Sequence, residues 1–252
     1  MHILGKRLLV VTAHPDDESF LAAGTMLKNA AAGGKNFVFC ATLGERGKAH
    51  LKTERSSAEL KRIRRRELER VSKFLRVEAL KLGDLPDGGL SERKHRNALR
   101  HGLLAFSAHV KPDMVLGFGR DGISGHLDHI TAGDVAAALA EKLGVPYLAF
   151  CMSPELQDSR GIQALARRRA YGVYIEHHHA LESPDIIVQI DGRRKLKALK
   201  IHASQLERGD PFHNMPRPAA RAMLQAEYFA LRASYTQRAR GGFLYTKKRS
   251  KS

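Results

Sequence analysis

Residues 8–18, Leu-Leu-Val-Val-Thr-Ala-His-Pro-Asp-Asp-Glu, decide both the fold and the site that the sequence predicts. The first four residues form a short apolar run, which is typical of a buried strand. One histidine and three acidic residues follow, and ligands of open parallel sheets bind beyond the carboxyl ends of strands. His14, Asp16 and Asp17 are therefore candidate site residues. A bound cation would relieve the repulsion between neighbouring carboxylates, although an acidic helix N-terminus favours carboxylates as well.

Strands and helices alternate through the first 151 residues. Apolar runs predict strands at 8–11, 36–42, 79–82, 113–118 and 147–151. The helical spacing of apolar residues predicts helices at 18–32, 54–76, 91–110 and 128–143. This alternation is typical of an α/β domain with a mostly parallel sheet flanked by helices.

The region after residue 171 predicts additional C-terminal strands and helices. Segments 173–175 and 186–190 are expected to pair as strands, and segments 195–206 and 219–233 are expected to be helices. Because no linker divides the chain, we expect residues 1–246 to form one domain and the basic residues 247–252 to be a disordered tail. For the three histidines at 177–179, a solvated loop is favoured over a metal site.

The composition is that of a folded, basic protein. The 252 residues include 43 Lys and Arg against 26 Asp and Glu, a formal net charge of +17, and 43% are hydrophobic. These proportions disfavour disorder, and no apolar run reaches the ~18 residues of a transmembrane helix. The apolar run near the N-terminus is too short for a secretory signal, so we expect a cytoplasmic protein. Cys40 and Cys151 lie in apolar runs, which predicts reduced, buried thiols.

The basic excess predicts an anionic partner: a nucleic acid, a membrane surface or an anionic substrate. Nucleic-acid-binding modules usually combine basic residues with stacking aromatics. Here aromatic residues make up only 6% of the chain and Trp is absent, and the sequence has no zinc-finger spacing. Nucleic acid is therefore the weaker interpretation of the charge.

A second polar cluster follows the strand predicted at 113–118. Residues 119–129 are Gly-Arg-Asp-Gly-Ile-Ser-Gly-His-Leu-Asp-His, so His126, Asp128 and His129 are expected at the same sheet edge as the first cluster. His and Asp are suitable zinc ligands, and three protein ligands leave a position for water. A remaining carboxylate could then accept a proton from that water. Two histidines and a carboxylate also form the triad of non-haem iron oxygenases, but that site normally lies in a β-rich fold.

The two clusters together resemble the signatures of the PIG-L/LmbE-like family of zinc-dependent N-deacetylases. His-Pro-Asp-Asp-Glu at 14–18 and His-Leu-Asp-His at 126–129 carry the resemblance. Further matches are Gly-Glu-Arg-Gly at 44–47, Arg64-x-x-Glu67, Asp87-Gly88, His-Ala-Ser-Gln at 202–205 and Glu-Tyr-Phe at 227–229. The resemblance implies a Rossmann-like α/β fold and hydrolysis of an N-acetyl group on an amino sugar or sugar conjugate.

The resemblance also implies a role for each site residue. His14, Asp17 and His129 would bind Zn²⁺, and Fe²⁺ or Co²⁺ would accept the same ligands. Asp16 would be the general base for metal-activated water, His126 would stabilise the oxyanion or protonate the leaving amine, and Asp128 would orient a neighbouring histidine. Substrate hydroxyl or phosphate groups would contact Glu45, Arg46, Arg64 and Asp87, although solvated surface charges explain these four residues equally well.

The implied partner is a small N-acetylated sugar or glycoconjugate, and the basic charge favours an anionic one. A close alternative keeps the metal site but cleaves a different amide, such as that of a thiol conjugate. Both a monomer and an oligomer are compatible with the sequence.

Overall fold

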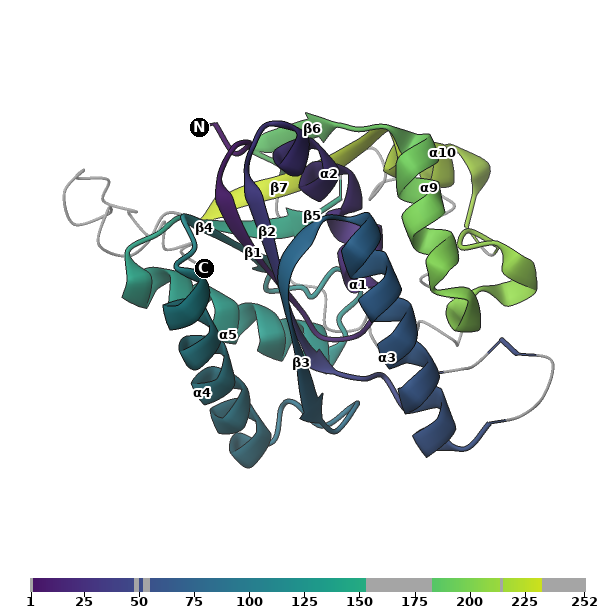
Figure 1. Cartoon of the computed structure of the whole chain (residues 1–252), viewed down its shortest axis with the longest axis horizontal. Helices are drawn as coiled ribbons and strands as arrows, with labels where there is room; N and C mark the ends of the chain where they lie inside the picture. Colours follow the sequence, from purple (N-terminus) through teal and green to yellow (C-terminus); the bar gives the residue numbers. More distant parts are fainter. Residues whose placement is uncertain (1, 48–49, 52–54, 153–182, 214, 233–252) are drawn as a thin grey trace, which may run out of the picture.

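The computed structural model describes residues 2–47, 50–51, 55–152, 183–213 and 215–232, and within them seven strands form one sheet (Figure 1). The strand order is β3 (Val77–Leu85), β2 (Lys35–Thr42), β1 (Arg7–Thr12), β4 (Met114–Phe118), β5 (Tyr147–Cys151), β7 (Ala226–Arg232) and β6 (Ile186–Gln189). β1 to β5 are parallel, whereas β7 is antiparallel to β5 and β6. The predicted α/β class with a mostly parallel sheet is confirmed.

β1 is the strand at which the chain order reverses. Its residues 8–10 pair with β2 on one side and with β4 on the other. β4 and β5 are buried along their whole length and β1 along nearly all of it, which explains why short apolar runs predicted these strands. The crevice beyond the carboxyl ends of the strands at such a reversal is the usual ligand site of an open α/β sheet.

Helices cover both faces of the sheet (Figure 1). On one face α4 (Arg93–Val110) packs against α5 (Leu127–Leu143); on the other lie α1 (Asp17–Leu21), α2 (Ala23–Ala31), α3 (Ser57–Phe74) and α9 (Gly192–Ile201). The single helix predicted at 18–32 is two helices, because Ala22 interrupts it at φ −143°. α3 starts later than predicted because Ser56 and Glu59 form a reciprocal capping box. In the described part of the chain, no helix combines the length and apolarity needed to cross a membrane.

The structure corrects the predicted C-terminal elements. The helix predicted at 219–233 was wrong in its second half: α10 (Arg217–Gln225) is followed directly by β7. β5 would otherwise leave an unpaired edge, and β7 pairs with it while burying Phe229 and Ala230. The helix predicted at 195–206 is α9 followed by the short 3₁₀ turn η1 (Ala203–Gln205).

Two other expectations concern segments that the structure does not describe. Residues 173–175, the predicted partner of 186–190, lie outside the described residues, and the partner that the structure shows for β6 is β7. The predicted tail at 247–252 also lies outside them. Cys40 and Cys151 are both buried, as predicted.

A buried ion pair joins the C-terminal strand to the helices. Lys195 Nζ of α9 lies 3.0 Å from Glu227 Oε1 of β7, and both side chains are 1% exposed. The Glu227 carboxylate also accepts hydrogen bonds from the backbone N–H groups of Gly24 (2.9 Å) and Thr25 (2.7 Å) in the first turn of α2. One carboxylate therefore holds together three elements that are distant in sequence.

Lys195→Met is expected to lower the free energy of unfolding by about 3–5 kcal/mol, because it leaves the Glu227 carboxylate buried without its cation. Urea unfolding followed by circular dichroism measures this loss. Lys200→Met, the same change at an exposed position of the same helix, is the matched control and should change stability by no more than about 0.5 kcal/mol. A Lys195→Met protein as stable as wild type would show that the ion pair contributes no net stability.

Candidate metal centre and active site

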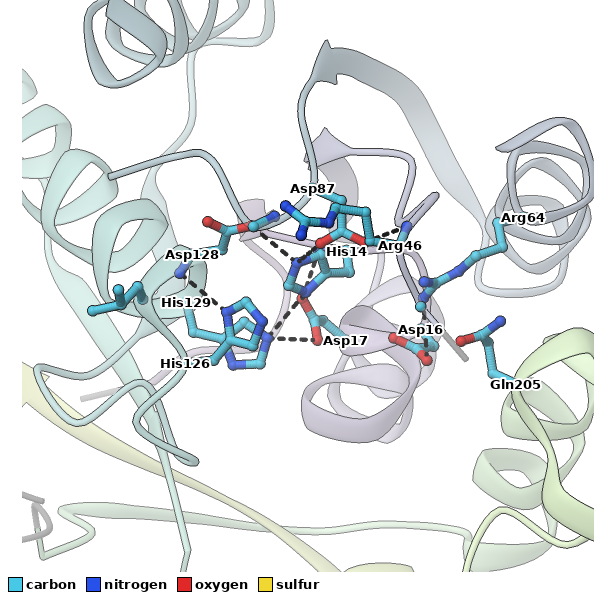
Figure 2. A pocket seen from close by; sticks show the side chains of 13 residues that line it. His14, Asp16, Asp17, Arg46, Arg64, Asp87, His126, Asp128, His129 and Gln205 are labelled. Atoms are coloured by element: carbon cyan, nitrogen blue, oxygen red, sulfur yellow. Dashed lines mark hydrogen bonds and ion pairs between the residues drawn. The ribbon is translucent and has the colours of Figure 1, made fainter. Parts of the chain in front are cut away.

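A pocket with a volume of about 710 Å³ lies beyond the carboxyl ends of β1 and β4 (Figure 2). Its residues come from the β1–α1 turn, the start of α5, the loops after β2 and β3, α3 and η1. Nine of the ten predicted site residues line it, and Glu45 is the exception. The structure therefore brings the two predicted clusters together at the point where the strand order reverses.

The β1–α1 turn separates two neighbouring carboxylates. Asp17 Oδ2 accepts hydrogen bonds from the backbone N–H groups of Ala13 (3.1 Å) and His14 (2.8 Å), which fold the side chain back over the strand end. Asp16 has a φ of 109°, in the left-handed region that residues with a Cβ rarely adopt. As a result Asp17 faces the histidines, whereas Asp16 faces Arg64.

Three side chains, those of His14, Asp17 and His129, converge in the pocket. His14 Nδ1 lies 3.2 Å from His129 Nε2, and His129 Nε2 lies 3.4 Å from Asp17 Oδ1. His14 Nδ1 and Asp17 Oδ2 are 3.9 Å apart. Ligand bonds of about 2.0–2.1 Å in a tetrahedral zinc site place neighbouring donor atoms about 3.3 Å apart. The spacing of the two imidazole nitrogens and the Asp17 carboxylate therefore fits one metal ion.

The hydrogen bonds of both imidazoles leave the facing nitrogens as electron-pair donors. His129 Nδ1 lies 2.9 Å from the Gly122 carbonyl oxygen. His14 Nε2 lies 3.1 Å from Asp87 Oδ1 and 3.3 Å from Asp128 Oδ2. Because carbonyl and carboxylate oxygens only accept, these two nitrogens carry the protons. The lone pairs of His14 Nδ1 and His129 Nε2 would then face each other, an arrangement that needs a cation between them.

The electrostatics of the pocket favour positive charge at the same point. Burial lowers the pKa of His14, but hydrogen bonds with Asp128 and Asp87 outweigh burial and raise it to about 10. The pKa of His129 is lowered to about 3 by burial and by the charge on His14. The pocket thus stabilises one positive charge between the two rings, either a proton or a metal ion, but not a second positive charge.

A second possible donor set, His14 with His126 and Asp128, is less well suited to a metal. His126 is the N-cap of α5, and its Nδ1 accepts the backbone N–H of Asp128 at 3.1 Å. The two oxygens of Asp128 accept the N–H groups of Gly88 (2.7 Å) and Leu90 (2.9 Å). Both oxygens of Asp128 and Nδ1 of His126 are therefore already used, whereas in the first set Asp17 Oδ1, His14 Nδ1 and His129 Nε2 face one another.

His126 is a neutral hydrogen-bond donor at the edge of the pocket. Burial and the nearby charges of His129 and His14 lower its pKa to about 4. Because Nδ1 accepts a backbone N–H, the proton of the neutral ring lies on Nε2. The rings of His126 and Phe118 both stack on the ring of His129, with centroid distances of 5.0 and 4.0 Å. The stacking restricts the orientation of the candidate metal ligand.

Asp16 is the pocket carboxylate that faces away from the convergent donor atoms. Burial raises its pKa to about 6, and the charge of Arg64 opposes this rise. Arg64 Nη2 lies 3.4 Å from Asp16 Oδ2, and the guanidinium also donates to the carbonyl oxygens of Gly44 and Pro15. Gly44, at φ +65°, is needed here because a Cβ would collide with the guanidinium.

The four predicted substrate residues differ in their availability. Arg46 is exposed and lines the pocket, whereas Arg64 is buried and its two terminal nitrogens contact Asp16, Pro15 and Gly44. Asp87 contacts His14 Nε2 and accepts a hydrogen bond from the backbone N–H of Arg46 at 2.9 Å. Burial raises the pKa of Asp87, but the hydrogen bond from His14 outweighs burial and lowers the pKa to about 2. Glu45 accepts the backbone N–H of Asp87 at 3.0 Å and so supports the loop behind the pocket.

The pocket also contains Gln205, which the sequence interpretation did not place in the site. Ser204 holds it: Ser204 Oγ donates to Glu67 Oε2 at 2.6 Å, and Gln205 Nε2 donates to Ser204 Oγ at 3.1 Å. Figure 2 shows the amide oxygen of Gln205 directed towards Asp16. The His-Ala-Ser-Gln match at 202–205 was the sequence signal for this segment, but only the tertiary structure shows that it reaches the pocket.

Such a donor set, beside a further carboxylate at the edge of an α/β sheet, is typical of enzymes that activate water at a metal ion. The family model PIG-L, described as GlcNAc-PI de-N-acetylase, matches residues 9–140, slightly more than half of the chain. The chain therefore belongs to the PIG-L family, and it is an N-deacetylase.

Two curated relatives match over most of both chains. One is the 1D-myo-inositol 2-acetamido-2-deoxy-alpha-D-glucopyranoside deacetylase of Streptomyces avermitilis, 30% identical over 90% of this chain and 92% of that protein. The other, from Bacillus anthracis, is named probable N-acetyl-alpha-D-glucosaminyl L-malate deacetylase 2 and is 29% identical over 79% of this chain and 81% of its own length. Both relatives are named as deacetylases of an N-acetylated glucosamine unit.

Solved structures share the fold. N,N'-diacetylchitobiose deacetylase from Pyrococcus horikoshii has a TM-score of 0.60 at 21% identity, covering 90% of this chain and 84% of that one. The zinc-inhibited form of teicoplanin deacetylase Orf2 also has a TM-score of 0.60, at 15% identity, covering 89% and 96%. GalB, the 4-carboxy-2-hydroxymuconate hydratase of Pseudomonas putida, has the same TM-score at 24% identity, covering 89% and 95%. Because a hydratase shares the fold, the fold alone does not determine the reaction.

Proposed function

We propose that this deacetylase binds one divalent ion, Zn²⁺, through His14, Asp17 and His129, and removes the acetyl group from an N-acetylglucosamine unit of a small conjugate. The observation that carries the proposal is the convergence of two imidazole lone pairs and one carboxylate, spaced 3.2–3.9 Å apart. When bound, the ion supplies a Lewis acid that lowers the pKa of water and polarises an amide carbonyl.

The surrounding residues then have separate tasks. Asp16 accepts the proton of the attacking water at its carboxylate, because it lines the pocket and pairs with Arg64, whereas the other three pocket carboxylates each contact a histidine. His126 donates its Nε2–H to the oxygen of the amide as negative charge develops there. Asp128, with Asp87, holds the Nε2–H of His14 and so fixes the tautomer in which Nδ1 can act as a ligand.

The substrate class follows from the relatives and from the pocket wall. Both curated relatives are named for N-acetylated glucosamine joined to a small polar group, inositol or malate. Arg46 is exposed at one side of the pocket here and the Gln205 amide lies at another, which suits contacts with sugar hydroxyl groups. The net charge of +17 and the exposed guanidinium favour a conjugate that carries an anionic group.

Acetate release from a panel of N-acetylated substrates tests this function. The panel contains N-acetylglucosamine joined to a neutral or an anionic group, and N-acylated thiol conjugates. We expect acetate from the sugar conjugates, faster with the anionic group, and one divalent ion per chain by elemental analysis. Removal of the ion by chelation should stop the reaction, and Zn²⁺, Fe²⁺ or Co²⁺ added back separately identifies the ion that restores it.

Two outcomes of the same panel would contradict the proposal. Amide cleavage confined to thiol conjugates would assign a different amidase reaction to the same site. Full activity in protein from which all divalent metal has been removed would show that the convergent donor atoms have another role.

A further inference from the structure

A buried contact connects a histidine of the C-terminal half to the β1–α1 turn. His202, the residue at which α9 ends, places Nε2 2.7 Å from Glu18 Oε1. The side chains of His202 and Glu18 are 1% and 0% exposed, so solvent is excluded from the contact. The two residues are 184 positions apart in sequence, and neither lines the pocket. α9 packs against α1 and brings them together.

The second oxygen of Glu18 reaches the backbone of Asp16. The Asp16 N–H donates to Glu18 Oε2 at 3.0 Å, and Ser19 Oγ donates to Oε1 at 2.6 Å. The Asp16 backbone needs this support because its φ of 109° is unfavourable for a residue with a Cβ. Rotation to an ordinary negative φ would break the hydrogen bond to Glu18 and would turn the Asp16 side chain out of its present direction.

The charges of this buried group are complementary. Burial raises the pKa of Glu18, but the charge and hydrogen bond of His202 outweigh burial and lower it. Burial lowers the pKa of His202, and the charge of Glu18 reverses this effect and raises it. On the other side Asp16 contacts Arg64 (Figure 2), so its side chain and its backbone are each held by a separate partner.

We propose that His202 is a positioning residue for deacetylation: it fixes the Glu18 carboxylate, which holds Asp16 in the left-handed conformation that presents its carboxylate to the pocket. The inference rests on the proposed role of Asp16 as general base. A purely structural ion pair would change the stability of the protein but not the kcat of the folded molecules. A loss of kcat without a loss of metal or of substrate binding separates the two roles.

Two substitutions at position 202 provide the test. His202→Leu removes the donor to Glu18, whereas His202→Gln places an amide N–H close to the position of Nε2. His213→Leu is the matched control, because His213 is a half-buried histidine of the same C-terminal segment. Metal content, kcat and KM are measured on the metal-loaded proteins well below their unfolding temperatures, and crystal structures give the φ of Asp16.

We expect His202→Leu to retain one metal ion per chain and a KM within about threefold of wild type. Its kcat should fall about 10- to 100-fold, which is the usual effect of removing a residue that orients catalytic groups. His202→Gln should recover most of that loss, and His213→Leu should match wild type. In the crystal structure of His202→Leu, Asp16 should adopt a negative φ. If the leucine variant does not fold, His202→Asn replaces it, because the asparagine amide is too short to reach Glu18.

The inference would be overturned by an unchanged kcat, by loss of metal together with activity, or by an unchanged φ of Asp16 in the variant that lacks the donor. A double-mutant comparison keeps it distinct from the proposed function. In the Asp16→Asn background, His202→Leu should have no further effect on kcat. If Asp16→Asn itself keeps the wild-type kcat, the proposed role of Asp16 is wrong, and the φ of Asp16 still decides whether His202 positions that residue.

Discussion

His129→Ala should abolish stoichiometric metal binding and reduce deacetylation by at least about 10³-fold, since the metal contributes several kcal/mol to charge stabilisation and each 1.36 kcal/mol is a factor of ten in rate. The substitution removes one of three convergent donor atoms and leaves His14 Nδ1 facing empty space where His129 Nε2 lay 3.2 Å away. Elemental analysis of the purified protein and acetate release by the same sample measure both effects. His14→Ala should behave in the same way.

The matched control is His109→Ala, which changes an exposed histidine of α4. This variant should keep one metal ion per chain and wild-type activity. Full metal retention by both His129→Ala and His14→Ala would contradict the assignment of the metal ligands. Loss of activity without loss of metal would instead place these histidines in contact with the substrate.

Asp16→Asn should lower kcat by about 10²- to 10⁴-fold, the range typical of general acid–base catalysis. The amide keeps the size of the carboxylate but cannot accept the proton of the attacking water. Because Asp16 faces Arg64 and not the convergent donor atoms, the variant should retain one metal ion, and KM should change little. Steady-state kinetics combined with metal analysis separates this result from that of His129→Ala.

Asp134→Asn is the control for this charge change, since Asp134 forms an exposed ion pair with Arg96 on the outer surface of α5. It should leave both kinetic constants within about twofold of wild type, because exposed ion pairs contribute little. A wild-type kcat for Asp16→Asn would exclude Asp16 as the base. Loss of the metal would show that Asp16 is a ligand.

The parallel part of the fold was predictable from short apolar runs. β4 and β5 are buried along their whole length and β1 nearly so, so these strands are almost continuously apolar and stand out from their flanking loops. β7 was not predictable in the same way. Residues 219–233 have a composition that suits a helix, and the helix ends at Gln225 because the edge of β5 provides hydrogen-bond partners for the residues that follow. Pairing with a distant strand overrode local propensity.

The two polar clusters of the site were also predictable, because each follows a buried strand and parallel strands share one carboxyl edge; the choice of His14, Asp17 and His129 as candidate metal ligands came from the resemblance to a family. The roles of the residues around them were not. Arg64 was a candidate substrate contact, yet it is buried and donates to two carbonyl oxygens beside Asp16. Its contacts depend on how α3 packs against the loops after β1 and β2, which the spacing of residues along one helix does not determine.

The sequence thus determined the class of the protein and the edge of the sheet that holds the two polar clusters, because each of these depends on a strand and the residues that follow it; the resemblance to a family added three candidate metal ligands. Only the tertiary structure shows how the chain turns Asp17 towards the histidines and Asp16 towards Arg64. That arrangement depends on the left-handed backbone of Asp16, held through Glu18 by His202 from 184 residues further along the chain. Contacts over such a separation exist only after α9 has packed against α1, so no local pattern encodes them.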